Sequence, residues 1–302
     1  RAVAALLASI PSGERCMNHN AFTQRRAIVA GGTAGFGLVL ARHLVAAGSS
    51  VLLVGRSSAG VRRGLSCFPK AADSHPGVHG LAADLGRAGE GERTAAEAAR
   101  VLGGVDDVFF CVGRSGRGAI LKTSPQRLQE FLDANLFAAV ELTQAVAADV
   151  AAARGSLVYI GSLAGKLASP FVGPYAVGKA ALAAYVDAVR LELNPMGGHV
   201  LLVSPGPIGR RSDDPAAERA ATRYAAEIAE AGLPPEAAAP GGTRSLTPLD
   251  PDRLAEQILD ACRRRRSELV VPRKAALMAG LIDWFPNAGR RLLARMTGHG
   301  RP

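Results

Sequence analysis

The stretch AIVAGGTAGFGLVLARHLVAAG, residues 27–48, decides the fold of this 302-residue chain. It begins with a short apolar run typical of a buried strand, continues through a glycine-rich turn and ends as an amphipathic helix. Gly31 permits the tight turn, while Gly35 and Gly37 let the backbone approach a pyrophosphate and let the helix pack closely on a sheet. The N–H groups at the start of such a helix bind phosphate. The stretch therefore predicts a dinucleotide site in an α/β domain.

The same alternation of apolar strands and amphipathic helices continues along the chain. It predicts α/β architecture: a single Rossmann-like, doubly wound parallel sheet of about seven strands with helices on both faces. We expect a disordered or extraneous N-terminal extension at 1–23, a Rossmann-fold domain at 24–272 with a substrate lid or linker at 210–250, and a basic amphipathic tail at 273–302. Strands are predicted near 26–31, 50–55, 77–83, 105–111, 155–160, 198–203 and 268–271, and the clearest helices at 35–47, 124–150, 174–194 and 251–265.

Tyr175 and Lys179 stand four residues apart in PYAVGKAAL, and Ser162 lies thirteen residues before the tyrosine. A phenol is a poor proton donor at neutral pH because its unperturbed pKa is about 10. A lysine one helical turn away can lower that pKa with its positive charge, and a serine hydroxyl from a neighbouring strand end can hold a carbonyl oxygen beside the phenol. The set can protonate an oxygen, or deprotonate an alcohol, while a hydride moves at the adjacent carbon. A bare pair at this spacing is also common on half-exposed helices.

Together the two signals resemble the short-chain dehydrogenase/reductase family over residues 24–272. The family's order of motifs is kept, because a glycine turn, an Asn, a Ser and the YxxxK pair follow one another. Asn135 lies in FLDANLFAAV, and SPGPIGR at 204–210 resembles the loop that closes over the nicotinamide. Where the family usually has NNAG after its fourth strand, only Gly113 matches firmly, so the fine geometry of the cofactor site departs from the family's.

The resemblance implies a role for each matched residue. Tyr175 acts as acid in reduction and base in oxidation, Lys179 lowers its pKa and contacts the nicotinamide ribose, and Ser162 orients the reacting oxygen. Asn135 holds a water that links the lysine to solvent. The predicted catalytic residues are Asn135, Ser162, Tyr175 and Lys179, and the predicted cofactor contacts are Gly31, Thr33, Ala34, Gly35, Phe36, Gly37, Arg56, Asp84, Leu85, Gly113, Tyr175, Lys179, Pro205, Gly206 and Ile208.

Arg56 indicates which nicotinamide cofactor binds. It follows a strand-ending glycine in VLLVGRS, where an NAD-specific enzyme would carry Asp or Glu for the ribose 2′-hydroxyl. An arginine can instead pair with a 2′-phosphate and stack on the adenine. NADP(H) is therefore favoured over NAD(H). Asp84 resembles the acidic residue that contacts the adenine amino group.

Composition limits the remaining partners. The formal charge is +10, but no aromatic-rich basic stripe accompanies it, so we expect no nucleic-acid partner. Unpaired cysteines and scattered histidines indicate a cytoplasmic, reducing location and no metal site. Trp284 and Phe285 between basic clusters suit a tail helix at a membrane interface, a subunit interface or the substrate cleft. Pro286 would divide that tail into two short helices. A homodimer or homotetramer and a small, lipid-like carbonyl or alcohol substrate are further expectations.

The sequence therefore predicts an NADP(H)-dependent oxidoreductase that interconverts a carbonyl and an alcohol. The alternative is a nucleotide-binding regulatory or redox-sensing relative without significant turnover; loss of Tyr175 or Lys179 would signal it, and both are present. An epimerase or dehydratase on the same fold would usually carry a longer carboxyl-terminal domain than residues 273–302 can supply.

Overall fold

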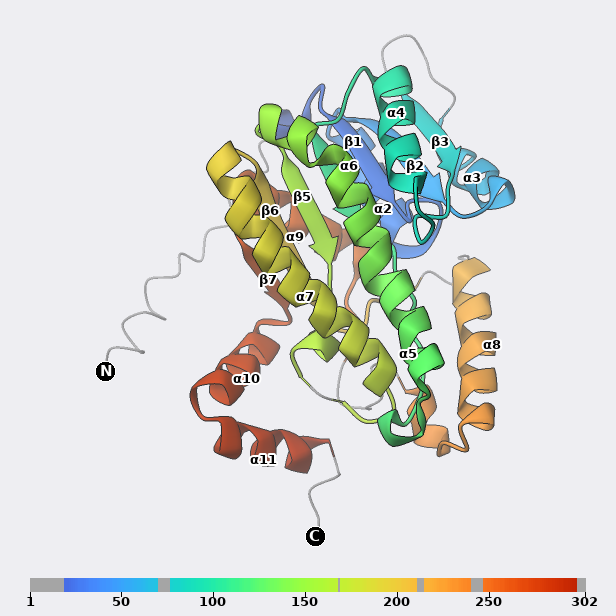
Figure 1. The fold of residues 1–302 in the computed structure, drawn as a ribbon, viewed down its shortest axis with the longest axis vertical. Coiled ribbons are helices and arrows are strands. Elements are labelled where there is room, and N and C mark those ends of the chain that lie inside the picture. The colour runs from blue at the N-terminus through green and yellow to red at the C-terminus, as the bar shows by residue number, and fades with distance from the viewer. Residues whose placement is uncertain (1–18, 70–76, 168, 211–214, 240–246, 298–302) are drawn as a thin grey trace.

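The computed structural model describes residues 19–69, 77–167, 169–210, 215–239 and 247–297. Within them, seven strands form one all-parallel sheet in the order β3-β2-β1-β4-β5-β6-β7 (Figure 1). This confirms the predicted doubly wound sheet, and the strand positions agree within a few residues. The strands are β1 (Arg26–Ala30), β2 (Ser50–Gly55), β3 (Val78–Ala82), β4 (Asp107–Phe110), β5 (Ser156–Ile160), β6 (His199–Pro205) and β7 (Glu268–Val271).

Helices cover both faces of the sheet. In Figure 1, α4 (Glu90–Leu102), α6 (Ala138–Ala152) and α7 (Gly173–Leu193) lie on the near face, while α2 (Gly35–Ala46) and α9 (Pro251–Arg263) lie behind it. The other helices are α3 (Ser58–Leu65), α5 (Pro125–Leu132), α8 (Pro215–Glu230), α10 (Arg273–Trp284) and α11 (Pro286–Met296), with short turns η1 (His19–Phe22), η2 (Ile120–Lys122), η3 (Asp133–Phe137), η4 (Leu163–Gly165), η5 (Asn194–Met196) and η6 (Pro235–Ala238).

Each central strand contributes to two hydrophobic cores because successive side chains point to opposite faces of a sheet. In β1, Ile28 and Ala30 pack with the helices of the near face, whereas Ala27 and Val29 pack with α2 and α9. All four side chains are fully buried. Apolar residues at every position are therefore what a strand covered on both sides requires.

The predicted helix 124–150 is interrupted. It is α5, then a π-helical turn, η3, at Asp133–Phe137, then α6. A π-turn inserts an extra residue into the helix and turns the following side chains, and such turns are frequent at functional sites. Asn135 lies within this turn and its side chain is buried.

Two outer segments complete the molecule. The segment predicted to be a substrate lid or linker contains α8, which begins at Pro215. The tail forms two helices, α10 and α11, separated at Pro286 as expected. In Figure 1 both tail helices lie below the carboxyl ends of the strands, and α8 stands on the other side of the same end. Among the described residues, no helix combines the length and the apolar character needed to cross a bilayer.

The first turn of α2 packs directly on the glycine turn. A Cβ atom at Gly37 would lie 2.3 Å from the carbonyl oxygen of Gly31, which itself has a φ of +80°. At Gly280, inside α10, an added Cβ would meet no atom within 4 Å. The fold therefore has no room for a side chain at Gly37 but has room for one at Gly280.

We expect Gly37→Ala to destabilise the fold by about 1–3 kcal/mol, the usual cost of overpacking a core. Gly280→Ala is the matched control and should be neutral or stabilising by up to ~1 kcal/mol, because alanine favours a helix. Urea denaturation of both variants measures the difference. Equal effects of the two substitutions would contradict the packing described for α2.

Candidate active site

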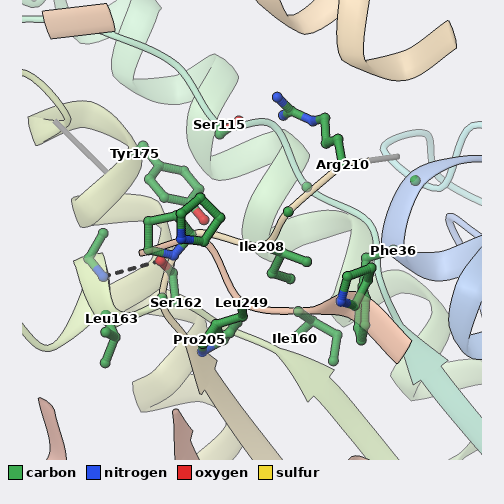
Figure 2. Close-up of a pocket in the computed structure, with 18 of the residues that line it drawn as sticks. Phe36, Ser115, Ile160, Ser162, Leu163, Tyr175, Pro205, Ile208, Arg210 and Leu249 are labelled. Atoms are coloured by element: carbon green, nitrogen blue, oxygen red, sulfur yellow. Dashed lines mark hydrogen bonds between the residues drawn. The ribbon is translucent and has the colours of Figure 1, made fainter. Parts of the chain in front are cut away.

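The carboxyl ends of β4, β5 and β6 and the first turn of α2 open into one cleft (Figure 2). Its volume is about 1650 Å³. Single small-ligand sites usually enclose about 300–1,000 Å³, so this cleft has room for a cofactor and a substrate side by side. Ligands of open α/β sheets bind at this edge, where the order of the strands reverses, here between β1 and β4.

The glycine turn fits a phosphate group. Gly31 and Gly35 have positive φ angles of +80° and +57°, which glycine adopts without strain. Ala34, the residue before α2, provides no side-chain cap, so the first N–H groups of the helix have no side-chain acceptor. A bound pyrophosphate would satisfy them. A Cβ atom at Gly31 would also lie 3.0 Å from the backbone of Cys111, so the turn needs glycine there.

Ser162 and Tyr175 meet at the end of β5. The Ser162 hydroxyl accepts a hydrogen bond from the Ala164 N–H at 3.1 Å, which fixes its position. It also hydrogen-bonds the Tyr175 phenol, which reaches the cleft from the first turn of α7. Figure 2 shows both side chains lining the cleft. A carbonyl oxygen placed between them would face two hydroxyl groups.

Lys179 lies one turn further along α7 and is only 4% exposed. Its Nζ donates a hydrogen bond to the carbonyl oxygen of Ile160, the last residue of β5, at 2.8 Å. Burial lowers the pKa of Lys179 to about 8, because the charged form loses water. This lysine is thus poised to lose its charge a little above neutral pH.

The expected lowering of the Tyr175 pKa is wrong for this structure. Burial raises the pKa of Tyr175 to about 12, and the hydrogen bond with Ser162 opposes the rise only in part. The physical reason is that a phenolate in the wall of the cleft loses hydration, while the Lys179 ammonium is directed to the Ile160 carbonyl. At neutral pH the phenol therefore carries its proton.

Asn135 connects this set to the rest of the fold. Its Nδ2 donates to the carbonyl oxygens of Phe131 at 2.9 Å and Arg114 at 3.0 Å. Its Oδ1 is buried and has no hydrogen-bond partner among the described residues. A Cβ atom at Gly113 would lie 2.8 Å from this oxygen and 3.1 Å from Lys179 Nζ, so the two polar atoms flank the same glycine. An unpaired buried oxygen beside an ammonium fits a bound water or a ribose hydroxyl.

The remaining predicted cofactor residues divide into two groups. Gly35, Phe36, Gly113 and the residues of the closing loop line the cleft, with Ile208 bridged to Leu249. The Leu85 side chain is buried in a hydrophobic core, so only its backbone is available to a ligand. Those outside the cleft lining are Gly31, Thr33, Ala34, Gly37, Arg56, Asp84 and Leu85, while Pro205 and Gly206 belong to the lining.

Arg56 and Asp84 follow β2 and β3 on the far side of the glycine turn. Arg56 is exposed and directly precedes Ser57, whose hydroxyl caps α3. Asp84 accepts a hydrogen bond from the Gly86 N–H at 3.3 Å and lies 3.7 Å from Arg87. Neither residue lines the cleft, so a contact of either with an adenosine stays a prediction.

A polar cluster that the sequence did not predict lies at the other end of the cleft. Tyr224 of α8 hydrogen-bonds Ser115, and the Arg117 guanidinium lies 4.3 Å from the centre of its ring. Arg117 is buried and donates from Nε and Nη2 to the carbonyl oxygens of Ala237 and Ala239. The only sequence signal was an isolated tyrosine in an alanine-rich lid helix, which does not reveal its partners.

Comparisons with known proteins identify the family and the fold. The sequence profile of the short chain dehydrogenase family matches residues 25–220. The chain is 30% identical over 249 residues to dehydrogenase/reductase SDR family member 7B of Xenopus tropicalis, covering 81% of this chain and 76% of that protein. It is 27% identical over 185 residues to the ketoacyl reductase HetN of a Nostoc strain, covering 61% and 63%.

A solved structure shows the same fold. A short-chain dehydrogenase from Streptomyces avermitilis superposes with a TM-score of 0.67 and covers 87% of this chain and 98% of its own. Its sequence is 22% identical to this chain, so the similarity shows the fold alone.

The depressed pKa of Lys179 makes stability depend on pH. An unfolded lysine titrates near 10.4, whereas burial holds the Lys179 pKa to about 8. Between these values the unfolded chain binds a proton that the folded chain has released, so the free energy of unfolding rises with pH. Below pH 8 both states are protonated and the buried charge is a constant cost.

We therefore expect the wild type to gain stability relative to Lys179→Met as pH rises from about 8 to about 10, by on the order of 3 kcal/mol. Urea denaturation at several pH values measures the difference. Lys122→Met, at an exposed lysine, is the matched control. Parallel pH profiles for wild type and Lys179→Met would show that the ammonium is solvated after all.

Proposed function

Because the chain belongs to the short-chain dehydrogenase/reductase family and is therefore an oxidoreductase, we propose that it interconverts a carbonyl and an alcohol with NADP(H). The observation that carries the proposal is the meeting of the Ser162 hydroxyl, the Tyr175 phenol and the buried Lys179 in one cleft. These groups can hold one oxygen atom and exchange a proton with it. Proton exchange at an oxygen is what carbonyl reduction and alcohol oxidation share.

In this mechanism Ser162 holds the carbonyl oxygen and Tyr175 gives it a proton. A phenol with a pKa of about 12 is protonated at neutral pH, so the resting state is ready for reduction. Lys179 stabilises the phenolate that remains, and its position beside the unpaired Asn135 oxygen provides a route for the returning proton. The cofactor, when bound, supplies or accepts the hydride at the adjacent carbon.

The residues that would hold NADP(H) extend along the cleft. The glycine turn would hold the pyrophosphate at the uncapped start of α2. Arg56 would pair with the 2′-phosphate, and Lys179 would contact the nicotinamide ribose. The closing loop, with Pro205, Gly206 and Ile208, would cover the nicotinamide. NAD(H) is disfavoured because no carboxylate stands at position 56.

A regulatory protein without turnover is the alternative. It would need the nucleotide site but not a matched acid and lysine beside it. The depressed pKa of Lys179 favours the enzyme, because a lysine buried at a cleft wall costs stability and such costs are usually found at functional sites.

Tyr175→Phe should abolish turnover while leaving NADPH binding nearly intact, because phenylalanine keeps the ring and removes only the transferable proton. We expect a loss of about 10²–10⁴-fold in kcat, typical of a general acid. Tyr185→Phe, at a tyrosine outside the cleft lining, is the matched control. A variant that keeps more than half the wild-type rate would remove Tyr175 from the mechanism.

Arg56→Asp should weaken NADPH binding by about 10–100-fold and shift the preference towards NADH, because a carboxylate would face the 2′-phosphate. Fluorescence titration with both cofactors measures the preference. Arg62→Asp, at another exposed arginine of this segment, is the control. The assignment fails if the two variants behave alike or the preference is unchanged.

We also propose that the tail helices attach the enzyme to an anionic membrane surface and admit a lipid-like substrate. Leu277, Trp284 and Phe285 are 63%, 78% and 60% exposed. Over residues 273–296 five basic side chains accompany a single acidic one. Aromatic and aliphatic groups flanked by cations are typical of helices that lie in a membrane interface. The inner side of the same helices, at Met278 and Leu293, lines the cleft.

The proposal predicts that the full chain binds vesicles containing phosphatidylserine and not neutral vesicles. Replacing Trp284 and Phe285 together by serine should weaken that binding roughly tenfold or more, because the apolar anchors are lost. Leu191→Ser, at an exposed leucine of α7, is the matched control. No binding by the wild type, or unchanged binding by the double variant, would refute membrane attachment.

A further inference from the structure

The cleft carries an excess of positive charge. Of the charged residues that line it within the described part of the chain, seven are basic and one, Asp250, is acidic; the basic ones are Arg42, Arg117, Lys179, Arg210, Arg223, Arg253 and Lys274. A cleft lined by one sign of charge concentrates ligands of the opposite sign. The phosphates of a dinucleotide explain the charge near the glycine turn. They do not explain the arginines around Tyr224, a residue that lines the same cleft as Tyr175.

Three arginines surround the Tyr224 side chain. The guanidinium groups of Arg117 and Arg223 lie 4.3 Å and 5.1 Å from the centre of its ring. Arg210, at the end of the closing loop, hydrogen-bonds its phenol, which is also hydrogen-bonded to Ser115. Burial would raise the pKa of Tyr224, but these hydrogen bonds and the charges of Arg210 and Arg117 hold that pKa below its usual value.

Of the three arginines around Tyr224, Arg117 has its side chain occupied by contacts within the protein. Its guanidinium donates to the carbonyl oxygens of Ala237 at 2.5 Å and Ala239 at 3.0 Å, and the backbone N–H of Arg117 donates to the Glu227 carboxylate. Glu227 is 5% exposed and is shared between Arg114 and Arg127 at 3.3 Å and 2.9 Å. These contacts fasten the lid to the loop after β4. They also occupy the Glu227 carboxylate with other arginines.

Arg210 and Arg223 retain hydrogen-bonding capacity that faces the cleft. Arg210 is exposed at the mouth of the cleft, and Figure 2 shows its guanidinium group beyond Ser115. Neither arginine forms an ion pair with a carboxylate within the part of the chain that the structure describes. The Nε atom of Arg223 is buried and lacks a hydrogen-bond partner there. A buried unpaired donor of a charged group is costly, so an acceptor is expected at that place.

This cluster is adjacent to the reacting groups. Ser115 lies two residues after Gly113, which flanks Lys179 Nζ and Asn135 Oδ1. Tyr175 and Tyr224 line the same cleft and are close enough to influence one another electrostatically. A molecule with its carbonyl oxygen at Ser162 and Tyr175 would therefore reach the cluster with another part of its structure. The tail helices provide apolar contacts, at Met278 and Leu293, for the remainder.

We propose that Arg210, Arg223 and the Tyr224 phenol form a subsite for an acidic group, a carboxylate or a phosphate ester, on the substrate. The substrate is then an anionic carbonyl compound with an apolar body. The inference rests on the proposed function, because it places this second group relative to the carbonyl that Tyr175 protonates. Guanidinium groups form strong, charge-assisted hydrogen bonds with both kinds of anion, and the phenol adds a neutral donor.

The test uses the full chain with NADPH and methyl ketones of increasing chain length that end in a carboxylate, each paired with its methyl ester. A second series with a terminal phosphate monoester distinguishes the two anions. The wild type should prefer an acid over its ester in kcat/KM. In Arg210→Met and Arg223→Met this preference should fall by about 10–100-fold, the range for one charge-assisted hydrogen bond. Arg100→Met, at an exposed arginine of α4, is the matched control and should keep it.

A binding measurement separates this inference from the proposed function. Calorimetry in the absence of cofactor, where neither dodecanoate nor dodecanol can react, should show tighter binding of the carboxylate, and the arginine variants should lose the difference. Anion binding without turnover of any ketone would sustain the subsite and overturn the proposed reaction. Turnover of ketones with no preference for acids, or equal losses on acids and esters, would overturn the subsite and leave the reaction intact.

Discussion

The hydrogen bond from Lys179 Nζ to the carbonyl oxygen of Ile160 is the interaction on which the active site depends, because it ties α7 to the end of β5. A buried ammonium is costly, so the surroundings must be close and polar to hold it. Glycines make the approach possible. A Cβ atom at Gly165 would lie 2.9 Å from the Lys179 backbone, and one at Gly178 would lie 3.1 Å from the Phe131 carbonyl oxygen. Held in this way, α7 presents Tyr175 to Ser162.

The same constraint explains the π-turn that divides α5 from α6. The turn buries Asn135 against α7, with its amide donating to two backbone carbonyls and its oxygen left beside Lys179. The site is thus assembled from three elements that meet at one edge of the sheet. Its two titratable groups are shifted in opposite directions by the same cause, since burial favours the neutral phenol and the neutral amine.

The fold could be predicted because its signals are local. Apolar strands, the turn at Gly31 and the helix break at Pro286 each follow from a few neighbouring residues. The spacing of Tyr175 and Lys179 places them on one helix face. It does not reveal how deeply the two groups are buried, and burial sets their pKa values. The polar cluster around Tyr224 could not be predicted for a related reason. Arg117 donates a hydrogen bond to the carbonyl oxygen of Ala237, and the two residues are 120 positions apart in the sequence. Such contacts depend on where α8 packs, which no local pattern specifies.

The central claim is that this cleft transfers a hydride to a carbonyl carbon while the chain's own groups protonate the oxygen. The most direct measurement is a reaction of the full chain with a ketone and NADPH that carries deuterium at both hydrogen positions on C4 of the nicotinamide, followed by mass spectrometry and NMR of the product. The account predicts deuterium bound to the carbinol carbon and a hydroxyl proton that comes from solvent. An alcohol without deuterium at that carbon, or no alcohol with any carbonyl class at saturating NADPH, would contradict it.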